Sequence, residues 1–144
     1  MTCHENLKQF FRIFANIACF VMLVRGTKRP VACYWQRGVL PARALVHVAN
    51  GGGVGLLTGH PSHIIVIDAD RNAERLFKYP KLAQSCRVTR PNAPDRIKIL
   101  IRIAGPIPCS QRVPAAGLEL LSTGAQAAIA GQHPSGAYYQ LSDA

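Results

Sequence analysis

The spacing of apolar residues predicts how the first third of the chain folds. Between residues 5 and 18, apolar side chains recur every three or four positions, which is typical of an amphipathic helix. We therefore expect a helix over residues 5–18 that leads into a buried strand over residues 19–24. A basic turn follows at residues 26–30, and the run Pro41–Ala49 is predicted to form a second, short helix.

Two apolar runs in the middle of the chain, residues 54–58 and 63–68, are predicted to be neighbouring strands. The four-residue turn between them is typical of a β-hairpin. A helix is expected to begin at residues 72–77, just after the second run. Residues 98–103 alternate basic and apolar side chains, so we expect a strand with one buried face there. Further short strands are predicted at residues 87–90, 117–122, 125–130 and 138–141.

The order of these elements indicates an α+β fold. Hairpin-like neighbours favour a largely antiparallel sheet, and the predicted helices would flank it. A chain of 144 residues is long enough to bury the core of one domain but short for two. Because the sequence contains no internal repeat and no low-complexity linker, we expect a single domain spanning residues 1–144.

The chain carries a strong excess of positive charge. It has 17 Lys and Arg against 7 Asp and Glu, a formal net charge of +10. The basic residues are spread along the chain, which favours a basic surface or cleft for a nucleotide or nucleic acid. The glycine-rich run 50–55 lacks the Lys-Ser/Thr ending of a phosphate-binding loop, which argues against an ATPase.

Cysteine usage and apolar content bear on the compartment. The five cysteines are odd in number and form no Cys-x-x-Cys pair, so we expect a reducing cytoplasm and neither a zinc site nor a disulfide framework. The apolar segment 10–24 is interrupted by Arg12 and Asn16, and it is shorter than the roughly 20 apolar residues of a membrane span. We interpret it as part of the core, with a signal peptide as the alternative.

The scarce acidic residues point to the chemistry. Asp68 and Asp70 end an apolar run, and residues i and i+2 of a strand share a face, so we expect their carboxylates side by side. Such a pair repels unless a cation lies between the charges, and a hard divalent ion such as Mg²⁺ suits carboxylates together with substrate phosphates. Glu119 is a third acid embedded among leucines. Three carboxylates from two strands would suit a two-metal site for nucleotidyl transfer, although a solvated strand end is the alternative for Asp-x-Asp alone.

Four groups of residues occur in an order that resembles a known family. The first is the run 55–59 with Ser62 and the strand that ends in Asp68 and Asp70. A basic turn at 26–30, followed by Trp35, lies upstream, and Glu119 lies downstream within 117–121. The last is the His-Pro-Ser-Gly turn within 131–136, followed by Tyr139. Together they resemble the bifunctional DNA primase/polymerase (prim-pol) domain of the archaeo-eukaryotic primase superfamily.

The resemblance implies a primase-type sheet, related to the RNA-recognition fold, and template-directed nucleotide addition with Mg²⁺ or Mn²⁺. The substrates would be nucleoside triphosphates on a single-stranded DNA template, in the replication system of a mobile element or phage. The resemblance implies that the catalytic and metal-holding residues are Asp68, Asp70 and Glu119; that nucleotide and phosphate contacts come from Lys98, His133, Ser135, Arg96, Thr58 and Gly59; and that nucleic acid is bound by Lys28, Arg29, Arg90 and Arg102.

The chain departs from the family in its second motif. That motif has a His at the start of a strand, where it contacts the incoming triphosphate, but this chain has no His between His63 and His133. Lys98 falls at the corresponding position, with Arg96 beside it. A Lys pairs phosphate as a point charge, so we expect triphosphate binding to persist. The alternative is that Lys98 belongs to a solvated strand face.

Two other functions stay open at the level of sequence. One is a primase-like module that binds nucleic acid or nucleotide without polymerising, and the other is a metal-dependent nuclease or phosphohydrolase that uses the same carboxylates. Relative to the family the C-terminal edge looks abbreviated, and any helicase partner is expected on a separate chain. Trp35 would either stack on a base or pack in the core.

Overall fold

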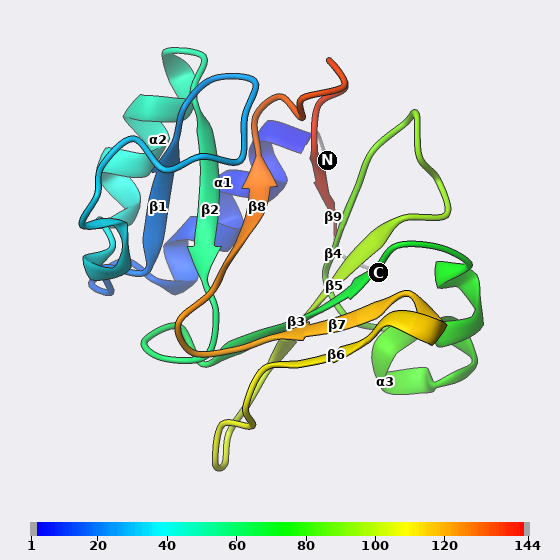
Figure 1. Ribbon diagram of the computed structural model, residues 1–144. Helices are drawn as coiled ribbons and strands as arrows, with labels where there is room; N and C mark the ends of the chain where they lie inside the picture. The colour runs from blue at the N-terminus through cyan, green and yellow to red at the C-terminus, as the bar shows by residue number, and fades with distance from the viewer. Residues whose placement is uncertain (1–2, 143–144) are drawn as a thin grey trace.

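The computed structural model describes residues 3–142, which fold into two antiparallel sheets. All the strand pairs in the described part are antiparallel, so the predicted α+β fold with antiparallel pairing is confirmed, although the strands divide between two sheets (Figure 1). The three-stranded sheet has the order β1 (Phe20–Leu23), β2 (Gly53–Leu57), β8 (Gln126–Ala130). The six-stranded sheet has the order β6 (Gln111–Val113), β7 (Leu118–Leu121), β3 (Ile64–Ala69), β5 (Ile97–Arg102), β4 (Arg87–Thr89), β9 (Gln140–Ser142).

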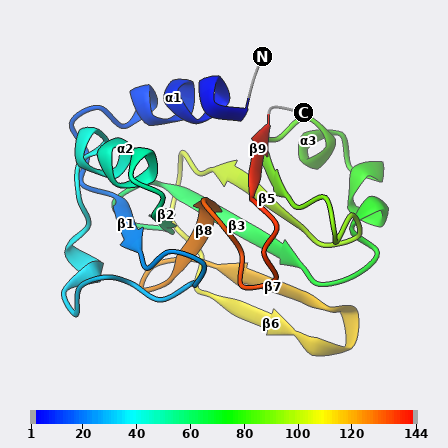
Figure 2. The same cartoon turned by 90° about the horizontal axis from the view of Figure 1, so that it is seen from above.

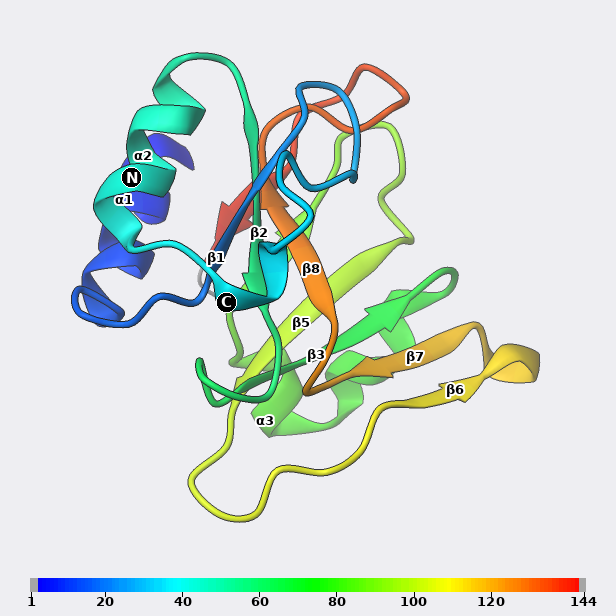
Figure 3. The same cartoon turned by 60° about the vertical axis from the view of Figure 1, so that its left-hand side comes forward.

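Helices α1 (Cys3–Ile13) and α2 (Pro41–Ala49) lie together on one side of the molecule, beside the three-stranded sheet (Figure 3). The bounds of α2 match the prediction, whereas α1 ends five residues earlier than expected because residues 14–16 form turns. Phe11 is buried and its ring centroid lies 4.3 Å from that of Phe20 on β1. Aromatic packing therefore ties α1 to the strand that follows it.

The predicted hairpin between β2 and β3 is wrong, because the two strands belong to different sheets. After Leu57 the chain crosses from the three-stranded to the six-stranded sheet, and only an isolated bridge links Gly59 to Ile64. The β7–β8 connection makes the reverse crossing next to it: the Thr58 backbone N–H donates to the Ala125 carbonyl (3.1 Å). We call these two passages the paired crossings; Figure 1 shows them where the two sheets meet.

Both faces of the six-stranded sheet are covered along β5, so the predicted single buried face is also wrong. Ile97 and Ile99 pack against the 3-10 helix η2 (Ala73–Lys78), which continues into α3 (Pro80–Ala83). Leu100 points the other way and is buried in the main core together with Val66. β6 is an edge strand of this sheet and lies lowest in Figure 2. Neither β6 nor α3 was expected from the sequence.

Two smaller points complete the comparison with the predicted elements. Trp35 begins the short 3-10 helix η1 (Trp35–Arg37) and packs against the main core, as one of its two predicted roles required. Of the helices within residues 3–142, none combines the length and the apolar character that crossing a membrane requires.

Candidate active site

Strand register brings four charged residues into one row across the six-stranded sheet. Asp68 on β3 lies directly opposite Lys98 on β5 and Glu119 on β7, and Glu119 in turn lies opposite Arg112 on β6. Residues directly opposite in an antiparallel pair point to the same face. We call Arg112, Glu119, Asp68 and Lys98 the charged row. Its two central members are carboxylates on adjacent strands, flanked by one cation on each side.

Asp68 is the most buried carboxylate of this row. Desolvation by burial raises its pKa above the usual value, while Lys98 lowers the pKa and the charge of Asp70 raises it further. Lys28 and Arg96 also lower it, but burial dominates. Among residues 5–142 no Lys, Arg or His nitrogen lies within 4 Å of its oxygens. The carboxylate is therefore held in a site that disfavours its charge and supplies no direct ion pair.

Asp70 occupies a different environment although it lies only two residues further on. β3 ends at Ala69, and the side chain of Asp70 is 58% exposed. Its Oδ1 accepts a hydrogen bond from the Arg96 guanidinium at 2.9 Å. Glu119 also has a cationic neighbour, since its carboxylate lies 3.8 Å from Nε of Arg112. Of the three predicted catalytic acids, Asp68 and Glu119 are brought opposite each other, and Asp70 is turned towards Arg96.

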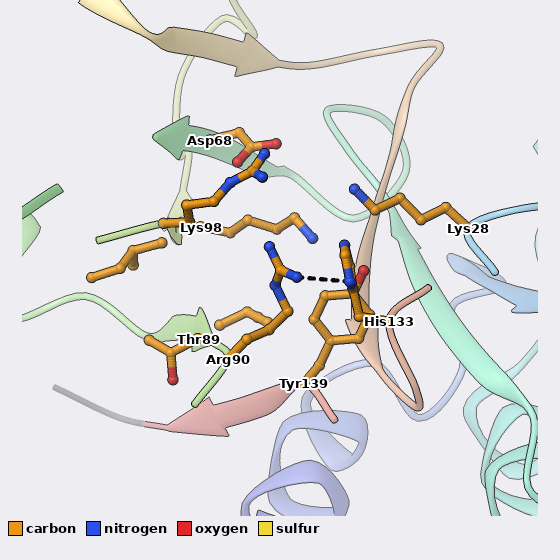
Figure 4. A pocket seen from close by; sticks show the side chains of 10 residues that line it. Lys28, Asp68, Thr89, Arg90, Lys98, His133 and Tyr139 are labelled. Carbon is orange, nitrogen blue, oxygen red and sulfur yellow. Dashed lines mark hydrogen bonds between the residues drawn. The ribbon is translucent and has the colours of Figure 1, made fainter. Parts of the chain in front are cut away.

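A narrow pocket opens beside Asp68, between the six-stranded sheet and the turn that follows β8 (Figure 4). Its free volume is about 30 Å³, so a ligand much larger than a water molecule would have to displace the side chains that line it. Asp68 is its only acid. The basic lining comes from three separate parts of the chain, and consists of Lys28, Arg90, Arg96 and Lys98, with His133 beside them. We call it the basic pocket.

Lys98 reaches across the basic pocket from one sheet to the other. Its Nζ donates a hydrogen bond to the carbonyl of Ala128 on β8 (3.0 Å) and lies 4.5 Å from the centre of the Tyr139 ring. Burial lowers the pKa of Lys98 to about 8, opposed by the charge of Asp68. Lys98 is thus not part of a solvated strand face, and its ammonium group lies at the inner wall of the pocket.

Arg90 and His133 meet on the other side of the pocket. An Nη1–H of Arg90 donates to Nδ1 of His133 at 2.7 Å, the contact drawn in Figure 4. The backbone N–H of Ser135 donates to the same nitrogen (3.0 Å). Because both groups can only donate, Nδ1 is an acceptor and the proton of the neutral ring is on Nε2. Burial and the charge of Arg90 lower the pKa of His133 to about 4, so the ring is uncharged at neutral pH.

Five of the predicted contacts do not line the basic pocket; one of them, Ser135, contacts His133 beside it. Thr58 is fully buried and its hydroxyl donates to the Ser122 carbonyl (2.7 Å), and Gly59 is buried in the turn with a φ of 71°. Both therefore shape the paired crossings and offer no side chain to a nucleotide. Arg102 lines a separate apolar groove beneath α1, and Arg29 is exposed on the β1–η1 connection.

Two residues contribute to the site without a role assigned from the sequence. Tyr139 packs its ring against both Lys98 and His133, at 5.7 Å between ring centroids for the latter. The side-chain amide of Asn92 donates to Oγ of Ser135 at 3.0 Å. Tyr139 was part of the family-like pattern, but no local signal in the sequence pairs Asn92 with a residue 43 positions away.

The donor set of the charged row suits a hard divalent cation. Asp68 and Glu119 supply carboxylate oxygens from adjacent strands, and like charges directly opposite each other are unfavourable without a cation. Within residues 5–142, however, no three His, Cys, Asp or Glu side chains gather so that they could hold a metal ion. Asp70 would have to exchange Arg96 for the metal. The predicted two-metal site therefore stays a prediction.

Comparison with known proteins identifies the family. A model of the family described as "Bifunctional DNA primase/polymerase, N-terminal" matches residues 13–144. The match includes every residue of the charged row and the basic pocket, and it leaves out most of α1. A search of curated proteins returned no match.

Proposed function

This chain belongs to the bifunctional DNA primase/polymerase family, and we propose that it is a metal-dependent enzyme that adds nucleotides to a strand under the direction of a single-stranded DNA template. The observation that carries the proposal is the position of Asp68. It is the one acid of a pocket lined by four Lys and Arg side chains, and it lies opposite a second carboxylate, Glu119. A cationic pocket attracts a polyphosphate, and a carboxylate pair attracts the metal that accompanies it.

Each wall of the basic pocket has a distinct part in the proposed reaction. Lys28, Lys98 and Arg96 neutralise the phosphates of the incoming nucleotide, and neutral His133 lies beside them, where its Nδ1 accepts a hydrogen bond from Arg90. Asp68 and Glu119 would hold Mg²⁺ or Mn²⁺. Such an ion, when bound, lowers the pKa of an attacking 3′-hydroxyl and stabilises the charge of the departing pyrophosphate.

Binding of the metal also accounts for a cost built into the fold. Asp68 is held where its negative charge is disfavoured, as the raised pKa indicates. A divalent cation would remove this penalty and the repulsion from Glu119 together. The metal would therefore balance the negative charges of Asp68 and Glu119, and the phosphates of the substrate would balance the positive charges of the basic pocket.

The proposal is tested by nucleotide incorporation on single-stranded DNA with Mg²⁺ or Mn²⁺, with and without an annealed primer. We expect Asp68→Asn, which keeps the shape of the side chain, to lower incorporation by roughly a hundredfold or more, equivalent to about 2.7 kcal/mol. The matched control is Asp95→Asn, since Asp95 is exposed and lies in the β4–β5 connection. Equal activity in the two variants would reject Asp68 as a catalytic residue.

A second candidate function is binding without synthesis, and the ion pair between Asp70 and Arg96 favours it. In a binding module Arg96 would neutralise Asp70 permanently and no metal site would need to form. The incorporation assay separates the two: a binding module retains nucleotide affinity and gives no product in either metal. A nuclease or phosphohydrolase would instead shorten the DNA or consume the nucleotide without extending a strand.

A further inference from the structure

Arg90 carries a positive charge that no acidic side chain of the described residues neutralises. The two ion pairs found within residues 5–142 join Arg96 to Asp70 and Arg112 to Glu119. The contacts of Arg90 are instead with neutral acceptors: Nδ1 of His133 at 2.7 Å and, at 3.5 Å, Oγ of Ser135. Hydrogen bonds to neutral acceptors orient a guanidinium group and leave its charge available to an anion.

Both contacts use the same end of the Arg90 side chain. They are made by Nη1, whereas the hydrogen bonds found for the described residues include none from Nη2 or Nε of Arg90. A guanidinium group has five N–H donors in a planar fork, which matches two oxygens of one phosphate. One arm of the fork is therefore fixed and the other is open to a ligand.

The fixed arm belongs to a network that is itself braced. Ser135 is held by the Asn92 amide at 3.0 Å, and its backbone N–H donates to the nitrogen of His133 that also receives Arg90. His133 packs edge-on against Tyr139, which is buried. Arg90 and Asn92 lie in one connection of the chain, and His133 and Ser135 in another. The network thus joins two loops on either side of the basic pocket (Figure 4).

The surroundings of Arg90 favour a compact polyanion over an extended one. Lys28, Arg96 and Lys98 line the same narrow pocket, against the single acid Asp68. A template strand spreads its charge at one phosphate per nucleotide, whereas a triphosphate concentrates about four negative charges in a few ångströms. Arg96 is already paired with Asp70, but Lys28, Arg90 and Lys98 still gather around one narrow pocket, which matches the second distribution.

We propose that Arg90 is a ligand of the terminal phosphates of the bound nucleoside triphosphate, and that His133 is a positioning residue that aims it. This inference rests on the proposed function and replaces the expectation that Arg90 follows the nucleic-acid strand. Ser135 and Asn92 complete the support.

The experiment compares two probes on the full chain in a metal-free buffer with EDTA. Inorganic tripolyphosphate reports the polyphosphate subsite, and a single-stranded oligothymidine reports template binding. We expect Arg90→Ala to weaken tripolyphosphate binding about tenfold or more and to leave oligothymidine binding within twofold. Arg43→Ala is the matched control, since it removes the same charge from the exposed surface of α2. Loss of oligothymidine binding with unchanged tripolyphosphate affinity would overturn the proposal.

A double-mutant cycle tests whether His133 acts through Arg90. His133→Ala is expected to weaken tripolyphosphate binding about three- to fivefold in the wild-type background and to have no further effect in Arg90→Ala. His133→Asn should restore most of the affinity, because an amide oxygen can accept the hydrogen bond of Arg90. Independent, multiplying effects of the two alanine variants would show that His133 does not position Arg90.

Two features keep the result interpretable. Thermal unfolding of each variant shows whether it is folded, and Ser135→Ala tests the same network should His133→Ala fail to fold, with an expected smaller loss of affinity. Neither probe requires synthesis. If Arg90 and His133 are coupled in tripolyphosphate binding but the protein incorporates no nucleotide, this inference is upheld and the proposed function is refuted. If the protein incorporates nucleotides but Arg90→Ala leaves tripolyphosphate affinity unchanged, the proposed function is upheld and this inference is refuted.

Discussion

The two faces of the six-stranded sheet are built from alternating residues of the same strands, yet the carboxylates Asp68 and Glu119 both lie on one of them. The other face is mainly apolar and includes Arg87, whose guanidinium lies over the Phe77 ring. On the face towards α3, Ile97 and Ile99 pack against Leu76 and its neighbours. On the opposite face Val66 and Leu100 belong to the main core, but Asp68 and Lys98, one step further along the strands, line the basic pocket. In such a site, packing on one face holds the sheet in place, while part of the other face carries the charged side chains.

The largest effect is expected on the apolar face. Ile99 is fully buried, so Ile99→Ala removes buried side-chain volume that its neighbours cannot refill, at a cost of about 2–5 kcal/mol in the free energy of unfolding. Urea denaturation measures the loss. Ile101→Ala, at a partly buried position of the same face, should cost less. If the two variants lost the same free energy of unfolding, the degree of burial on this face would not determine the stability of the sheet.

On the charged face the next effect concerns Lys98 and pH. Its pKa is lowered to about 8, so the ammonium group loses its proton as pH rises from 7 to 9. Tripolyphosphate affinity should fall roughly three- to tenfold over this interval in the wild type and clearly less in Lys98→Arg, because Arg stays charged. Calorimetric titrations at pH 7, 8 and 9 give the comparison. The same decline in both proteins would assign the pH dependence to another group.

A smaller effect distinguishes the stability of the charged face from its function. The folded-state pKa of Asp68 lies above its unfolded value, so the ionised carboxylate lowers stability at pH 7, and this cost disappears as pH falls towards 3.8. Asp68→Asn should therefore be slightly more stable than the wild type at pH 7 and no more stable at pH 4. Thermal unfolding at both values checks this, with Asp95→Asn as control. Destabilisation at pH 7 would mean that Asp68 is held by favourable interactions.

The smallest effect belongs to the edge of the charged row. Arg112 is 76% exposed and lies 3.8 Å from Glu119, an ion pair that water and salt screen. Arg112→Ala should change the free energy of unfolding by no more than about 0.5 kcal/mol, measured by urea denaturation at low and high salt. A loss above about 1 kcal/mol in the free energy of unfolding would show that Arg112 stabilises the other residues of the charged row.

Local patterns predicted most strands, and they failed where the partner of a strand mattered. The apolar runs that became β2 and β3 were recognised, but apolar content cannot tell a hairpin from a crossing between sheets. The deciding contacts come from Ala125 and Ser122, more than 60 residues further along the chain, which pair with Thr58. The alternation in β5 was read as one buried face because a second covering layer is invisible in a local pattern.

The site shows the same limit. Asp68, Lys98 and His133 stood out because scarce acids and a family-like order marked them, and all three line the basic pocket. Arg90 was expected along a nucleic-acid track, since one exposed-looking Arg in a basic chain resembles any other. The role that we propose for it depends on its contact with His133, 43 positions away, which only folding creates. Long-range partners of this kind leave no periodic signal.

The paired crossings carry a practical consequence for anyone who redesigns this protein. At Gly59 the backbone has a positive φ, and any side chain there would collide with Thr123 of the neighbouring passage. One of these passages leads into the strand of Asp68, and the other leads into the strand whose Ala128 receives Lys98. A shift at these crossings would therefore move Asp68 and the Ala128 carbonyl relative to each other. A redesign of this protein should leave Gly59 and Thr123 unchanged.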